Sequence, residues 1–174
     1  MEEVTEDPFY KMMAEDYADL MLDYAVISCG EEYCGETTHI DAVKEFFSLL
    51  SSRRREDDED FDCFTFHEER MSSQKCSVAE FFKTGDKKRP SGYMTYWFAF
   101  SQPPCPLPFG EKDFERINAV LFPKERRDAL EILCWNDDFS DYFDEGKEWW
   151  GTALWSIYDK QARRFVLIGA SLTD

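Results

Sequence analysis

The chain has 174 residues, of which 43% are hydrophobic and 17% aromatic, so a single domain with an ordinary core is expected and disorder of the whole chain is excluded. Its 37 acidic and 20 basic residues give a net charge of -17. Such a field disfavours direct binding to nucleic acid or to an anionic membrane. It favours a basic partner, or serves solubility alone.

The acidic excess lies mainly in the first third of the chain, where residues 1–62 hold 19 acidic and 5 basic residues. No run approaches the roughly 18 apolar residues of a membrane helix, and the first residues lack the basic start of a secretion signal. The sequence therefore predicts a cytoplasmic protein. In that compartment the six cysteines are expected to be thiols rather than a disulfide framework.

The segment from Pro8 to Ile27 has apolar residues close to a helical period, and proline suits the first position of a helix. We expect one helix here, with a row of carboxylates on its other side. Like charges four residues apart cost roughly 0.2 to 0.5 kcal/mol each, so folding alone gives no reason to keep them. Asp16, Asp19 and Asp23 are therefore candidate contacts for a basic partner, with a merely solvated face as the alternative.

A second amphipathic helix is expected from an N-cap at Thr37 or Thr38 through Leu50, ending near Ser52. Residues 53–60 (RRREDDED) then read as an exposed loop, in which a basic triplet meets an acidic run and the two can pair with each other.

The second half of the chain is rich in strand signals. A hairpin is expected from 149–158 and 164–171, joined by a polar turn. Neither strand alternates between apolar and polar residues, so both faces of this pair should be covered, as in the middle of a sheet. The remaining elements are expected strands at 61–66, 93–100 and 130–135, a capping box over 77–80, an extended proline-rich connection at 102–110 and a helix at 113–122.

These elements do not show the regular alternation of strand and helix that a parallel sheet requires. The sequence predicts an α+β fold, with a mainly antiparallel sheet of about five strands and helices packed on one face. We expect a single domain over 1–174, with a helix-rich acidic part at 1–60 and a sheet-rich part at 61–174.

The segment 137–148 combines carboxylates with aromatic residues just before the hairpin. One hypothesis is a recognition patch, in which aromatic side chains anchor a partner and carboxylates meet its lysines or arginines. The alternatives are a solvent-facing turn without a role, a calcium site, or paired carboxylates for acid/base catalysis, although no EF-hand pattern is present. The candidate partner-binding residues here are Asp137, Asp138, Asp141, Tyr142, Asp144, Glu145 and Trp149.

Other chemistry finds little support in the motifs. The possible zinc ligands Cys29, Cys34, His39, Cys63 and His67 match no standard spacing, so they are interpreted as ordinary thiols and surface histidines. The two histidines stand in no recognisable nucleophile context, and the 8 glycines form no phosphate loop. We therefore predict no metal and no cofactor.

Three functions from different classes remain open. The first is an acidic cytoplasmic protein that binds and inhibits a basic protein, such as a nuclease or another nucleic-acid enzyme. Immunity proteins of toxin systems and nucleic-acid mimics are the analogues, by size and charge only. The second is a metal-dependent or hydrolytic enzyme that uses the carboxylates of 137–148. The third is a structural or scaffolding domain.

Overall fold

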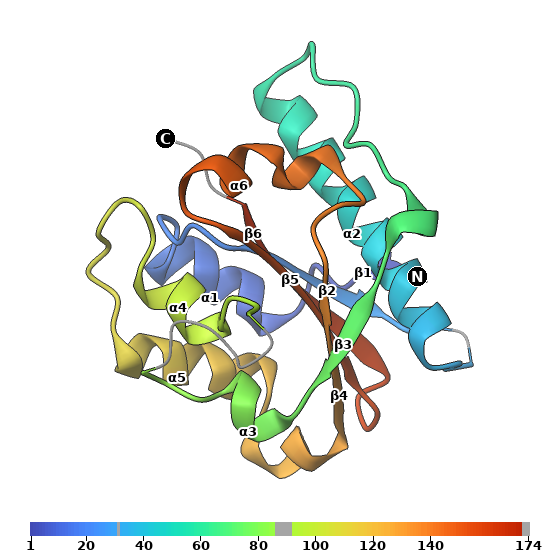
Figure 1. Ribbon diagram of the computed structural model, residues 1–174. Coiled ribbons are helices and arrows are strands. Elements are labelled where there is room, and N and C mark those ends of the chain that lie inside the picture. The colour runs from blue at the N-terminus through green and yellow to red at the C-terminus, as the bar shows by residue number, and fades with distance from the viewer. Residues whose placement is uncertain (31, 86–91, 172–174) are drawn as a thin grey trace.

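The computed structural model describes residues 1–30, 32–85 and 92–171, and it is built on one sheet of six strands in the order β1-β2-β6-β5-β4-β3 (Figure 1). All neighbouring strands are antiparallel. The α+β class and the antiparallel sheet are thus confirmed, with one strand more than the five expected. The strands are β1 (Glu2–Glu3), β2 (Asp23–Ser28), β3 (Ser73–Cys76), β4 (Leu130–Trp135), β5 (Thr152–Asp159) and β6 (Arg164–Ser171).

Helices cover both faces of the sheet, not one face as predicted. The helix α2 and the 3-10 turn η3 lie on one side, and α1, α3, α4 and α5 lie on the other (Figure 1). Successive strand residues point to opposite sides, so Leu154 and Tyr158 pack under α2 while Trp155 and Ile157 face the other layer. Because the central strands are apolar on both sides, each face needs its own cover. The expectation that both faces of the hairpin are covered is confirmed.

The helical elements follow the chain around this sheet. The α-helices are α1 (Pro8–Asp16), α2 (Glu36–Asp57), α3 (Val78–Phe81), α4 (Tyr96–Ser101), α5 (Glu111–Leu121) and α6 (Asp144–Trp149). The 3-10 helices are η1 (Glu68–Arg70), η2 (Lys124–Ala129) and η3 (Asp141–Phe143). The capping box at Ser77 and Glu80 and the helix over most of 113–122 are as predicted.

The first predicted helix is wrong in its second half. Helix α1 begins as expected, with Pro8 at its first position and the Asp7 carboxylate accepting the amide of Phe9 at 3.0 Å, but it ends at Asp16. The chain then turns and enters β2, which lies between β1 and β6. The part expected to be helix-rich, residues 1–60, therefore contains the two strands β1 and β2. A strand buried on both faces has no polar alternation, and its apolar run is easily taken for a helical one.

Two predicted strands after residue 60 are also wrong. Residues 61–66 form no strand, and most of helix α4 falls within 93–100. The Thr95 side chain caps α4 by accepting the amide of Phe98 at 3.1 Å. Tyr96, Ala99 and Phe100 are buried at helical spacing. The segment was predicted as a strand because aromatic residues are typical of strands.

Helix α2 is longer than predicted and takes in the first half of the expected loop at 53–60. It ends at Asp57, with Arg54 and Arg55 in its last turn, where cations are favoured by the helix dipole. Arg53 does not pair with the acidic run that follows it, because its guanidinium is bound to Glu3 and to the carbonyl of Tyr24. No helix within the described parts of the chain is apolar enough over the required length to cross a membrane.

Candidate functional site

The three carboxylates expected on one helical face are dispersed. Asp16 ends α1 and forms an ion pair with Arg116 at 2.6 Å, and Asp19 is exposed in the following turn. Asp23 is the first residue of β2, half-buried at the edge of the core. The predicted acidic face of the first helix is therefore wrong, because the helix ends before it can align these residues.

The acidic segment before the hairpin is folded with its aromatic residues inside and its carboxylates outside. Phe139, Tyr142 and Phe143 are buried against α2 and the sheet, while Asp138, Asp144 and their charged neighbours are exposed. Lys147 lies 3.7 Å from Asp138 and 3.5 Å from Asp144. The interleaved pattern thus fixes the segment on the core and directs its charge to solvent.

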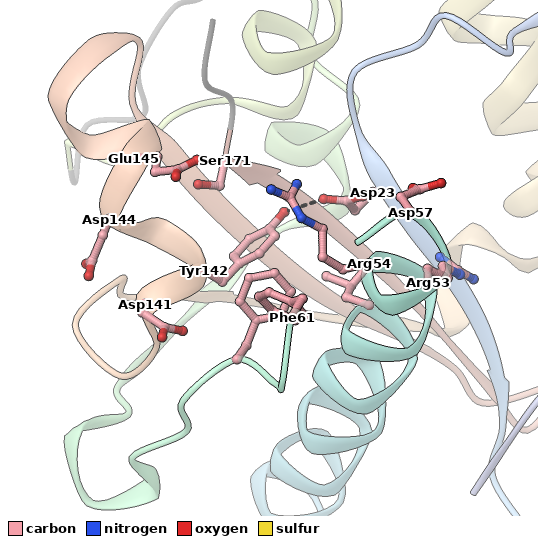
Figure 2. A pocket seen from close by; sticks show the side chains of 12 residues that line it. Asp23, Arg53, Arg54, Asp57, Phe61, Asp141, Tyr142, Asp144, Glu145 and Ser171 are labelled. Atoms are coloured by element: carbon pink, nitrogen blue, oxygen red, sulfur yellow. Dashed lines mark hydrogen bonds between the residues drawn. The ribbon is translucent and has the colours of Figure 1, made fainter. Parts of the chain in front are cut away.

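A cleft of about 530 Å³ opens between the end of α2, the segment 61–64 and the η3-α6 region (Figure 2). We call it the α2-α6 cleft. It brings together five of the ten predicted partner-binding residues, namely Asp23, Asp141, Tyr142, Asp144 and Glu145. Its other lining residues are Leu50, Arg53, Arg54, Asp57, Phe61, Phe64 and Ser171.

The base of the α2-α6 cleft is a hydroxyl-carboxylate pair. The Tyr142 hydroxyl donates to Asp23 Oδ2 at 2.7 Å. Burial raises the pKa of the Asp23 carboxyl, and the hydrogen bond from Tyr142 and the positive charge of Arg53 partly offset that rise. Gly169 pairs with Asp23 across the β2-β6 ladder, and a Cβ there would lie 2.6 Å from the Tyr142 hydroxyl. A glycine at this position leaves the space that the pair needs.

The walls of the cleft are aromatic and acidic. Phe61, Phe64 and Tyr142 stand close together, with ring centroids 4.9 Å apart for Phe61 and Phe64 and 5.4 Å apart for Phe64 and Tyr142. Asp141 closes one wall by accepting the amide of Thr65 at 2.9 Å, while its own amide donates to the Thr65 hydroxyl. Asp57, Asp144 and Glu145 are exposed on the rim.

The remaining predicted contacts lie outside this cleft. Asp137 and Asp138 line a second hollow of about 400 Å³ with Tyr93, Met94 and Trp135, and Asp137 accepts the hydroxyl of Thr152 at 2.5 Å. Trp149 is 69% exposed at the end of α6 and lines neither hollow. The residues of the predicted recognition patch are therefore divided between two hollows, with Trp149 outside both.

Sequence reasoning missed the contribution of α2 to the site. Leu50, Arg53, Arg54 and Asp57 follow the helical spacing of positions 0, 3, 4 and 7, and all four line the cleft. That spacing is visible in the sequence once the helix is continued past Ser52. Treating 53–60 as a loop removed the periodicity that would have shown these residues to share a face.

The possible zinc ligands are not arranged around a common point. His39 is fully buried, not on the surface, and both of its ring nitrogens are occupied. Nδ1 lies 2.7 Å from the Ser156 hydroxyl and Nε2 lies 3.1 Å from the Tyr33 hydroxyl. Within the described residues, no three cysteine, histidine or carboxylate side chains come together as a metal site, and none of the six cysteines, all of them described, forms a disulfide.

The Ser156-His39 contact belongs to a buried hydrogen-bond network that no sequence motif predicted. The indole of Trp135 donates to Ser156 Oγ at 2.8 Å, and the same hydroxyl is hydrogen-bonded to His39 Nδ1, while His39 Nε2 is hydrogen-bonded to the Tyr33 hydroxyl. Burial lowers the pKa of His39 to about 4. Ser156 is wholly buried and lines neither hollow, so this pair acts as a structural element of the core.

Comparisons with protein-family models, with curated proteins and with solved structures gave no match for this chain. The function is therefore argued from the geometry of the α2-α6 cleft.

Proposed function

We propose that this chain is an acidic cytoplasmic binding protein that inhibits a basic protein partner, such as a nuclease or another nucleic-acid enzyme. The observation that carries the proposal is the α2-α6 cleft, which is lined by five carboxylates and has an aromatic wall. Aromatic anchors surrounded by charge are typical of protein recognition sites, and carboxylates at the rim select a partner with lysines and arginines.

The net charge of -17 adds long-range steering to this local site. A strongly negative field raises the rate of encounter with a basic protein, and its effect falls as salt screens it over a Debye length of about 10 Å at 0.1 M ionic strength. The acidic run at 56–60 is exposed throughout, and its member Asp57, the last residue of α2, lines the cleft. A nucleic-acid enzyme presents the complementary basic surface, which supports this class of partner.

The test compares two variants of equal charge. The cleft variant carries Asp57→Asn, Asp141→Asn, Asp144→Asn and Glu145→Gln, all at exposed positions. The control variant carries Glu6→Gln, Glu115→Gln, Glu125→Gln and Asp128→Asn, which are equally exposed and lie outside the cleft. Each protein is immobilised and used to capture partners from host lysate at low salt, with elution at high salt.

We expect the unchanged protein and the control variant to retain the same basic protein, and the cleft variant to lose it. The purified partner should then lose its activity when one equivalent of the unchanged protein is added. Equal retention by both variants would show that only general charge is at work and would overturn the proposal. Specific capture without inhibition would overturn the inhibitory role and favour a scaffolding function.

A further inference from the structure

The α2-α6 cleft already holds a guanidinium group from its own chain. Arg54, in the last turn of α2, places its Cζ atom 5.9 Å from the ring centroid of Phe61. Arg54 is exposed and lines the cleft, and Figure 2 shows its side chain extending from the end of α2 over this hollow. Among the described residues no carboxylate forms an ion pair with Arg54, so its position rests on the contact with an aromatic ring.

Its neighbour Arg53 is held in a different way. Arg53 Nη1 donates to the carbonyl of Tyr24 at 3.0 Å, and Nη2 is bound to the carboxylate of Glu3. Figure 2 shows the Arg53 guanidinium pointing away from Tyr142. Arg53 therefore ties α2 to β1 and β2, whereas Arg54 is anchored only weakly.

Negative charge exceeds positive charge around Arg54, and this excess favours the binding of a further cation. Five carboxylates line the cleft against two arginines, and the charge of Arg53 is already matched by Glu3 outside the lining. Lys147 lies against Asp144, but Asp57 and Glu145 have no ion-pair partner among the described residues. A second cation would be attracted to this partly enclosed space more strongly than to a flat surface of the same charge.

We propose that the α2-α6 cleft is a receptor for an arginine side chain of the basic partner, and that Arg54 is the internal occupant which this side chain replaces. The inference rests on the proposed function, since it names the group by which the partner is recognised. A guanidinium is planar, stacks on aromatic rings and binds carboxylates through paired hydrogen bonds, whereas the lysine ammonium is more strongly hydrated. The volume of about 530 Å³ lies in the range of pockets that enclose ligands of this size.

The probe is N-acetyl-arginine methylamide, titrated into the full chain at low salt and followed by amide and side-chain NMR shifts. N-acetyl-lysine methylamide serves as the comparison. We expect the arginine probe to shift resonances of residues that line the cleft, and to bind more tightly than the lysine probe.

Two matched pairs of variants locate the site. Arg54→Ala removes the internal occupant and should tighten binding of the probe about two- to fivefold, the factor that corresponds to an exposed cation-π contact. Arg55→Ala makes the same change of charge one residue along the helix, outside the cleft, and should have a smaller effect. On α6, Glu145→Gln should weaken binding, while Glu148→Gln, outside the lining, should not.

Equal effects of Arg54→Ala and Arg55→Ala would overturn the inference, because general charge would then explain both. Equal affinity for the two probes would also overturn it, since the cleft would accept any cation. The titration needs no partner, so its failure is distinct from that of the proposed function. A cleft that binds the probe in a protein that inhibits nothing would refute only the inhibitory role.

Discussion

The buried histidine makes the stability of this protein depend on pH in a direction that the structure fixes. His39 is fully buried in α2, and its pKa falls from an ordinary value of 6.5 to about 4 because burial disfavours the charged ring. In the unfolded chain the ring takes up a proton near pH 6.5, whereas in the folded protein it stays neutral down to about pH 4. Below pH 6.5 the unfolded state therefore binds more protons, and the free energy of unfolding decreases as the pH falls.

The magnitude follows from the size of the shift. A difference of 2.5 between the two pKa values amounts to about 3 kcal/mol over the full range, at 1.36 kcal/mol for each unit. Between pH 7.5 and pH 5 most of this is lost, so the free energy of unfolding should drop by about 2 kcal/mol because of His39 alone. Chemical denaturation with urea at several pH values measures this quantity.

The control is His39→Gln, which keeps a polar side chain but cannot take up a proton. Its own loss of stability is a constant offset, so the difference between the two proteins isolates the titration of His39 from that of the many carboxylates. We expect the difference in free energy of unfolding between the unchanged protein and the variant to decrease by about 2 kcal/mol from pH 7.5 to pH 5. If the free energy of unfolding changed with pH in the same way for both proteins, the reasoning would be refuted. Protonation of His39 would then not destabilise the folded state.

Two substitutions test other contacts on which the fold depends. Gly169→Ala would place a methyl group 2.6 Å from the Tyr142 hydroxyl and 3.1 Å from the Phe46 ring. We therefore expect the free energy of unfolding in urea to fall by about 1 to 3 kcal/mol, together with a change in the environment of Tyr142. Unchanged stability would contradict the close approach. Asp159→Asn removes the charge that faces Arg126 Nε at 3.0 Å at the buried end of β5, and we expect a loss of about 1 to 3 kcal/mol in the same assay, with Asp128→Asn on the surface as the neutral control.

The parts of the fold that the sequence predicted are those in which local pattern and tertiary environment agree. Strands β5 and β6 carry charge only at the ends that meet their polar turn, and their lack of alternation showed that both sheet faces are covered. Helix α5 has its apolar residues on one side and ends before Pro123. These signals need no knowledge of distant contacts.

The errors occur where the partner of a segment decides its structure. Tyr24 to Ile27 continue the apolar run of α1, and only the pairing with β1 and β6 makes them a strand. Residues 96–100 carry aromatic side chains typical of strands, but the Thr95 cap and the packing of Tyr96 and Phe100 on α5 and its surroundings favour a helix. Intrinsic preference is a weak guide when packing opposes it.

Only part of the candidate site could be predicted from the sequence, because the rest depends on contacts between distant segments. Asp141, Tyr142, Asp144 and Glu145 could be grouped from the sequence because they are neighbours in the chain, and all four line the cleft. Asp23 joins them only because β2 pairs with β6 in the register that sets it opposite Gly169. The missing side chain of that glycine admits the Tyr142 hydroxyl, which then reaches the Asp23 carboxylate 119 positions away in the sequence.

This dependence on register links the stability of the fold to recognition. A shift of one residue between β2 and β6 would turn Asp23 to the opposite face of the sheet and leave Tyr142 without its acceptor. The rim carboxylates on α6 and the end of α2 would still be exposed, so the protein would keep its charge and its attraction to basic molecules in general. It would lose the half-buried acceptor at the base of the cleft, which is the feature that distinguishes the proposed arginine site from a diffuse acidic surface.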